Sequence, residues 1–253
     1  MPLENLEFVR AVHLSFGRTD LWLATRVYSE IDGMIVLALD TAGVVCSAAV
    51  YDSGRNTVLG EASDMIGKGH AEHLIGIVDR ALGQADMTLS EVDRLAVTVG
   101  PGSFTGIRVG VAAARGFALS LQIPVVGVTT LEVMAAAERE RTPGRAVLAA
   151  MDAKRDEIYL QSFAADGSPL DAPRAASVAD AQAFAAGFDG EITGSATPLL
   201  KAGAGGDHAN VFPISVVARL GAAASADAGK PKPLYLRGPD AKPQAGYAIA
   251  RRV

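Results

Sequence analysis

The sequence is poor in cysteine. Its 253 residues include only one, Cys46, so the chain cannot form an internal disulfide or a cysteine-based metal cluster. This usage is typical of a reducing compartment, and we expect the protein in the cytoplasm. Cys46 lies inside an apolar stretch, where a thiol is usually unreactive.

Long apolar runs and excess positive charge are also missing. No uninterrupted apolar stretch of the sequence approaches the roughly 20 residues that cross a bilayer, so no membrane contact is predicted. The formal net charge is -5, which provides no general positive field for nucleic acid. If RNA is involved, we expect a partner protein to make most of the phosphate contacts.

Aromatic residues are few, at 6% of a chain that is 49% hydrophobic, which favours close packing of helices. Residues 1–33 mix charged and apolar side chains without a continuous signal-peptide core, and we assign no function to this extension. The sequence that follows predicts strands at 35–39, 45–51, 58–62, 95–99 and 124–128, and helices at 70–82, 105–121 and 131–141. A meander followed by alternating strands and helices predicts an α/β layer with parallel crossovers.

The region after residue 143 repeats this plan. Val147–Asp152 is an apolar run that ends in aspartate, as the run before Asp40 does, and Glu157–Phe163 is predicted to return as a second strand. Such similarity indicates a duplicated unit. We predict sub-domains at 34–143 and 144–229, the second degenerate with weak helices at 178–186 and 216–226, and a tail at 230–253 that packs at 234–236.

A glycine-rich stretch stands between the strand at 95–99 and the helix at 105–121. Gly100, Gly102 and Gly106 allow a tight turn, and the hydroxyl of Thr105 suits an N-cap. The N–H groups of such a turn can hold an anion. The stretch lacks the Gly-Lys-Ser/Thr ending of a P-loop and the spacing of a dinucleotide fingerprint, so a turn built for packing is the simpler interpretation.

The helix at 105–121 carries only two charges, Arg108 and Arg115. A helix that is apolar nearly all round needs cover on more than one side. Gly106, Gly110 and Ala114 recur every four residues and would let another backbone approach closely. Either this helix lies inside its own domain or a partner protein covers it.

Two aspartates, Asp40 and Asp152, follow apolar strands. Paired hairpins of this kind flank the phosphates and metal in actin-like ATPases and sugar kinases, but the hairpin after Asp152 has no glycine, and an aspartate at a strand end is otherwise a turn residue. The residues that would contact a nucleotide are Asp40, Thr41, Gly102 and Ser103.

Catalytic and metal sites are not predicted. His70 and His73 are three apart on the helix at 70–82, but the other histidines, His13 and His208, lie in unrelated regions of the sequence. A zinc site needs more ligands than this pair, so we interpret both as helix-start or surface histidines. No nucleophilic triad is recognisable in the sequence.

The stretch Gly100–Arg108 is similar to the signature of the TsaB family, the YeaZ-like bacterial proteins of threonylcarbamoyladenosine biosynthesis in the TsaD superfamily. Further similarity occurs, in order, at Leu37–Thr41, His70–Glu72, Val126–Leu131, Leu148–Ala153 and Pro233–Arg237. The resemblance implies a duplicated actin-like (ribonuclease H-like) α/β fold. It also implies a role in placing a threonylcarbamoyl group on the adenosine 3′ of the anticodon in tRNA.

In the family that this chain resembles, a metal-binding paralogue, TsaD, performs the transfer, and an ATPase, TsaE, completes the complex. The two histidines that bind the paralogue's metal correspond here to Thr130 and Met134, which are poor metal ligands. The resemblance therefore implies a non-catalytic subunit with no cofactor of its own. ATP or ADP would bind only in the assembled complex, and contact with tRNA would be indirect.

Members of this family pair with the paralogue through their first two helices, here 70–82 and 105–121. The resemblance places the interface at His70, His73, Leu74, Ile77, Gly106, Arg108, Val109, Gly110, Ala113, Ala114 and Phe117. Two alternatives stay open. The chain could be an independent actin-fold ATPase, kinase or metalloprotease-like hydrolase, or it could form a homodimer through the same helices.

Overall fold

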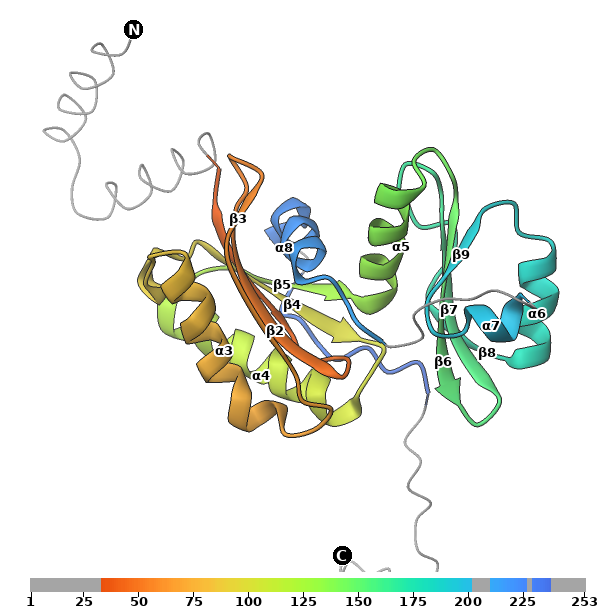
Figure 1. Cartoon of the computed structure of the whole chain (residues 1–253), viewed down its shortest axis with the longest axis horizontal. Helices are drawn as coiled ribbons and strands as arrows, with labels where there is room; N and C mark the ends of the chain where they lie inside the picture. The colour runs from red at the N-terminus through yellow and green to blue at the C-terminus, as the bar shows by residue number, and fades with distance from the viewer. Residues whose placement is uncertain (1–32, 202–209, 227–228, 238–253) are drawn as a thin grey trace, which may run out of the picture.

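The computed structural model describes residues 33–201, 210–226 and 229–237. The predicted extension at 1–32, the glycine-rich loop at 203–206 and the last part of the predicted tail lie outside the described residues. Two α/β units lie next to each other, each built on one mixed sheet (Figure 1).

The first sheet has the strand order β3-β2-β1-β4-β5. Strand β1 pairs antiparallel with β2 and parallel with β4, and β4 pairs parallel with β5. The predicted meander and parallel crossover are therefore confirmed. The strands are β1 (Ile35–Asp40), β2 (Val45–Asp52), β3 (Thr57–Met65), β4 (Arg94–Gly100) and β5 (Val125–Thr129).

Two helices cover one face of this sheet. Helix α3 (His70–Gln84) packs on β2 and β3, and helix α4 (Phe104–Leu121) packs on β4 and β1 (Figure 1). A short 3-10 helix, η1 (Leu89–Glu91), leads into β4. Because β1 is covered on both faces, its side chains from Val36 to Leu39 are fully buried, as an unbroken apolar run predicts.

Helix α8 (Ile214–Ala223) covers the other face, against β1, β2 and β4. A Cβ on Gly221 would lie 2.2 Å from the Cβ of Ala96, so the helix and the sheet are in close contact. The prediction that this region belongs to the second sub-domain is wrong, because the chain crosses back to the first sheet after residue 210 (Figure 1).

The second sheet has the strand order β8-β7-β6-β9. Its strand directions repeat those of β3-β2-β1-β4, with two antiparallel pairs followed by a parallel pair. In the described part of the chain, no strand occupies the place that β5 has in the first sheet. The strands are β6 (Val147–Lys154), β7 (Glu157–Phe163), β8 (Arg174–Ser177) and β9 (Glu191–Thr193).

Three helices complete the second unit. Helix α5 (Thr130–Arg141) connects the two units and packs on β6, while α6 (Val178–Ala186) and the short α7 (Thr197–Leu200) lie against each other. Helix α6 has the predicted bounds. The short elements β8, β9 and α7 were not predicted.

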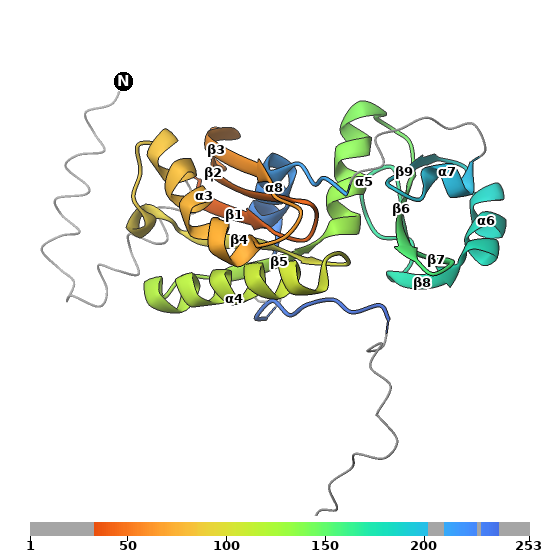
Figure 2. The same ribbon diagram turned by 60° about the horizontal axis from the view of Figure 1, so that its bottom comes forward.

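Residues 229–237 run past α4 toward the second unit (Figure 2). The N–H of Leu234 donates to the carbonyl of Val99 at 2.7 Å, and Leu234 and Leu236 pack on the first core. Arg237 donates to the carbonyls of Ala153 and Lys154 in the β6–β7 hairpin. The prediction that the tail packs at 234–236 is confirmed.

Candidate functional site

The glycine-rich loop packs on the turn between β1 and β2. The N–H of Ser103 donates to the carbonyl of Ala42 at 2.7 Å, and a Cβ on Gly102 would lie 2.3 Å from the same oxygen. The N-cap of α4 is Ser103, whose hydroxyl accepts from the N–H of Gly106. The prediction of Thr105 as N-cap is wrong because the helix begins at Phe104. The N–H groups of Ser103 and Gly106 are used within the chain, which supports the packing interpretation.

The stripe of small residues on α4 faces the first sheet, and we call this side the inner face of the helix. A Cβ on Gly106 would lie 2.0 Å from the carbonyl oxygen of Thr41, and one on Gly110 would lie 2.4 Å from the Thr41 hydroxyl. That hydroxyl donates to the carbonyl of Gly106 at 2.7 Å, and Ala114 is fully buried. The prediction that Gly106, Gly110 and Ala114 contact a partner is therefore wrong. Small residues permit close approach to a sheet as well as to another helix, and here they face the chain's own sheet.

Most of the interface residues predicted on α3 are also buried within the chain itself. His70, Leu74 and Ile77 are buried against the first sheet, so the prediction of a partner contact is wrong for these three. Five predicted interface residues do reach the surface: His73 and Arg108 are exposed, and Val109, Ala113 and Phe117 are half-buried.

The opposite sides of α3 and α4 form what we call the outer face. It is defined by Ile75, Gly76, Phe104, Ala112, Gly116 and Leu119. The exposed fractions of its three large apolar side chains are 51% for Ile75, 55% for Phe104 and 79% for Leu119. Helices α3 and α4 contact each other, so these residues lie on one side of the first unit.

Two glycines on the outer face have open space around them. A Cβ at Gly76 or Gly116 would meet no atom within 4 Å. Glycine inside a helix costs about 1 kcal/mol relative to alanine. Packing within the described residues therefore does not explain glycine at these two positions, and open glycines are suited to close approach by another backbone.

An aromatic and arginine cluster stands at one end of the outer face. The guanidinium carbon of Arg108 lies 3.8 Å from the ring centroid of Phe104, and its Nε donates to the Tyr235 hydroxyl at 2.8 Å. The rings of Phe104 and Tyr235 have centroids 5.3 Å apart. Ordered aromatic and arginine side chains with exposed surface are typical of binding hot spots.

Helix α4 alone among the described helices is long and apolar enough to cross a membrane, judged by length and composition only. Its inner side, including Ile107 and Val111, packs on the first sheet. The core helix of a globular domain passes the same test, so we interpret α4 as a core helix with one exposed side.

Asp40 lies fully buried at the end of β1. Its Oδ1 accepts hydrogen bonds from the Thr98 hydroxyl at 2.6 Å and the N–H of Ala42 at 3.0 Å. Its Oδ2 has no hydrogen-bond partner among the described residues. Burial outweighs these bonds and raises the pKa of Asp40 from 3.8 to about 6.

The environment of Asp152 differs. Its carboxylate accepts hydrogen bonds from the N–H and the ammonium group of Lys154, at 2.8 and 2.6 Å. Partial burial raises the pKa of Asp152, but the Lys154 hydrogen bonds and charge lower it further, so it falls below its ordinary value. The two strand-end aspartates therefore do not share one environment.

We expect Asp40 to make stability depend on pH. A pKa that is higher in the folded state stabilises the fold fully below pH 4, and this contribution is lost as pH rises through 6. The gap between 3.8 and about 6 corresponds to about 3 kcal/mol. Urea unfolding between pH 4 and 7.5 should show this fall in the wild type and not in Asp40→Asn. Parallel profiles for the two proteins would contradict the assignment.

Thr130 and Met134, the positions that the resemblance matches to the paralogue's metal ligands, have structural roles here. Thr130 is fully buried and donates to the carbonyl of Pro101 at 2.6 Å, and Met134 is buried on α5 beside Gly194. Among the described residues, no three His, Cys, Asp or Glu side chains are grouped as metal ligands. Burial and the nearby Asp40 and Asp64 charges raise the pKa of Cys46 to about 12, which agrees with the predicted unreactive thiol.

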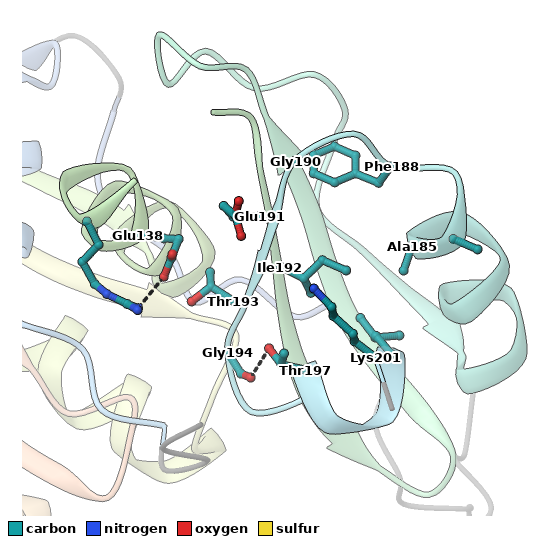
Figure 3. A pocket seen from close by; sticks show the side chains of 13 residues that line it. Glu138, Ala185, Phe188, Gly190, Glu191, Ile192, Thr193, Gly194, Thr197 and Lys201 are labelled. Atoms are coloured by element: carbon teal, nitrogen blue, oxygen red, sulfur yellow. Dashed lines mark hydrogen bonds and ion pairs between the residues drawn. The ribbon is translucent and has the colours of Figure 1, made fainter. Parts of the chain in front are cut away.

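A pocket of about 640 Å³ lies in the second unit, between the end of α5 and the elements β9, α6 and α7 (Figure 3). Glu138 on α5 is almost fully buried at its edge and accepts a hydrogen bond from Arg141 at 2.7 Å. No pattern in the sequence indicated this pocket, because β9 has only three residues and is too short for a recognisable strand pattern.

Residues 62–213 match the family model described as TsaD, tRNA N6-adenosine threonylcarbamoyltransferase. The chain is 34% identical over 133 residues to the Escherichia coli tRNA threonylcarbamoyladenosine biosynthesis protein TsaB, covering 53% of this chain and 56% of that protein. The Haemophilus influenzae TsaB is 36% identical over 130 residues, covering 51% and 54%. The chain thus spans about half the length of these curated relatives.

Two further comparisons extend over more of the chain. An uncharacterized protein of Mycobacterium tuberculosis is 33% identical over 226 residues, covering 86% of this chain and 98% of that protein. The solved structure of YeaZ from Pseudomonas aeruginosa is 26% identical, with a TM-score of 0.66, and covers 80% of this chain and 100% of the other.

An α/β fold of two mixed sheets and a family match over more than half of the sequence define the class: the chain belongs to the TsaD family. Within this family it is a TsaB-like, or YeaZ-like, protein. The resemblance inferred from the sequence is confirmed.

Proposed function

We propose that the chain is a non-catalytic subunit that binds and supports a TsaD-like catalytic paralogue during transfer of a threonylcarbamoyl group to the adenosine 3′ of the anticodon in tRNA. The reaction is inferred from the relatives named TsaB. The observation that carries the binding role is the outer face, with Phe104 and Leu119 more than half exposed beside the open Gly116.

The non-catalytic role rests on α5. Thr130 and Met134 stand where the resemblance places the paralogue's metal-binding histidines, and both side chains are used in packing. The repeated strand order of the two sheets supports a duplicated actin-like architecture whose second copy has become smaller.

The proposed partner would cover the outer face with its own helices. A specific interface usually buries about 1,600 Å² in total, and the exposed apolar side chains of α3 and α4 would form its centre. A TsaE-like ATPase would join this complex, ATP or ADP would bind only after assembly, and contact with tRNA would be indirect. The cytoplasm, where tRNA is modified, is the expected location.

The test is co-expression with the TsaD-family paralogue of the same genome. We expect a stable complex in size-exclusion chromatography and a loss of threonylcarbamoyladenosine from tRNA when the gene for this chain is deleted. Turnover of ATP by the isolated chain, abolished by Asp40→Ala, would instead support an independent ATPase. Metal-dependent peptide hydrolysis by the isolated chain would support a hydrolase and overturn the proposal.

A further inference from the structure

The edge of the second sheet is open at β9. This strand pairs with β6 on one side, and no strand in the described part of the chain pairs with its other side. The N–H of Glu191 donates to Ala146, toward β6. Backbone groups alternate along a strand, so the N–H and C=O of Ile192 point to the open edge. An open edge accepts another extended segment.

The pocket of Figure 3 lies along this edge. Phe188, Ile192 and Leu200 line it and belong to the second hydrophobic core cluster or pack against it. Side chains of Glu191 and Thr193 point toward α5, where Glu138 lies (Figure 3). A segment added here would have an apolar wall on one side and a polar wall on the other.

We propose that the C-terminal residues 247–250 of this same chain bind along β9 as a fifth strand, antiparallel to it. This sequence, Tyr247-Ala248-Ile249-Ala250, alternates large and small apolar residues and is followed by Arg251 and Arg252. Alternation places Tyr247 and Ile249 on one side of the added strand, which matches the apolar wall.

The C-terminal segment is long enough to reach from Arg237 to the open edge of β9. Arg237 binds the carbonyls of Ala153 and Lys154 at the tip of the β6–β7 hairpin, and sixteen residues of the sequence follow it. From Lys154, the open edge beside Thr193 is five residues back along β6 and two strand spacings across, about 20 Å. The ten residues from 238 to 247 can span about 33 Å.

The positions of charged residues support an antiparallel direction for the added strand. The hairpin tip lies beyond the C-terminal end of β6, and β9 is parallel to β6, so a segment arriving from Arg237 meets the C-terminal end of β9 first. It would then place Arg251 and Arg252 near Asp189 and Glu191. These two carboxylates pair with a single cation, Arg145, each at 3.5 Å, so two negative charges face one positive charge in these ion pairs.

Hydrogen exchange measured by mass spectrometry tests the proposal on the isolated full chain. We expect amides of residues 190–194 to exchange about tenfold more slowly in the full chain than in a variant that stops after Arg237. A synthetic peptide of residues 242–253 added to the shortened protein should restore the protection. Ile249→Asp should remove it, and the control Gln244→Ala should retain it.

Two outcomes would overturn the proposal. Equal exchange at 190–194 in the full and shortened chains would show that the tail does not bind there. Protection that rises with protein concentration, together with a dimer in light scattering, would show that a second copy supplies the strand. Neither measurement includes the paralogue, so the result is independent of the proposed function.

A further variant tests the direction of the added strand. The double variant Arg251→Glu with Arg252→Glu should weaken the protection, and an unchanged value would contradict the antiparallel direction.

Discussion

Gly110→Arg is expected to unfold the first unit. A Cβ at this position would lie 2.4 Å from the Thr41 hydroxyl and 3.3 Å from Val97, so even alanine would force a shift. Arginine would also bury a charge without a partner, which costs several kcal/mol. Because the free energy of unfolding of a domain is about 5–15 kcal/mol, most of it would be lost.

Urea unfolding and the yield of folded protein measure this effect. Gly116→Arg is the matched control, because it adds the same side chain to the same helix where no atom lies within 4 Å. A wild-type unfolding midpoint for Gly110→Arg would contradict the placement of the inner face on the sheet. Gly110 is therefore unsuitable for testing partner binding, although the sequence alone favours it.

Gly116→Arg is expected to abolish binding of the paralogue while leaving the fold intact. Replacing an open helical glycine should raise helix stability by up to about 1 kcal/mol. In the complex, the same arginine would separate the helices and lose its hydration, so we expect the dissociation constant to rise at least about 100-fold, or about 3 kcal/mol.

Calorimetry of the variant with the purified paralogue gives the dissociation constant. Ala183→Arg is the control, because it adds the same charge to an exposed position on α6 in the second unit and should bind like the wild type. Unchanged affinity of Gly116→Arg would show that the outer face is not the interface. Equal loss in both variants would point to a general effect of charge.

The sequence did not predict which side of α4 forms the outer face, and the reason is physical. Helix α4 has small residues on both sides: Gly106, Gly110 and Ala114 on the inner side, and Ala112 and Gly116 on the outer side. Periodicity shows that two faces exist but not which one meets the sheet. On α3, the resemblance placed Leu74 and Ile77 at the interface, whereas the structure buries both and leaves Ile75 exposed.

The sequence by itself determined the local structure and the family. Unbroken apolar runs predict the buried strands β1 and β4, the glycine-rich turn predicts the start of α4 to within a residue, and the ordered motif matches identify a TsaB-like protein. These features depend on neighbouring residues, and their signals are therefore contained in short stretches of the chain.

Tertiary structure alone decided which surfaces remain free. The inner face of α4 is closed by Thr41, sixty-five residues from Gly106, α8 returns to the first sheet, and β9 keeps an open edge because no described strand follows it there. Each of these depends on contacts between residues far apart in the sequence. Which face of an element is covered, and by which segment, is a property of the packed chain, so the pattern of residues in one segment cannot specify it.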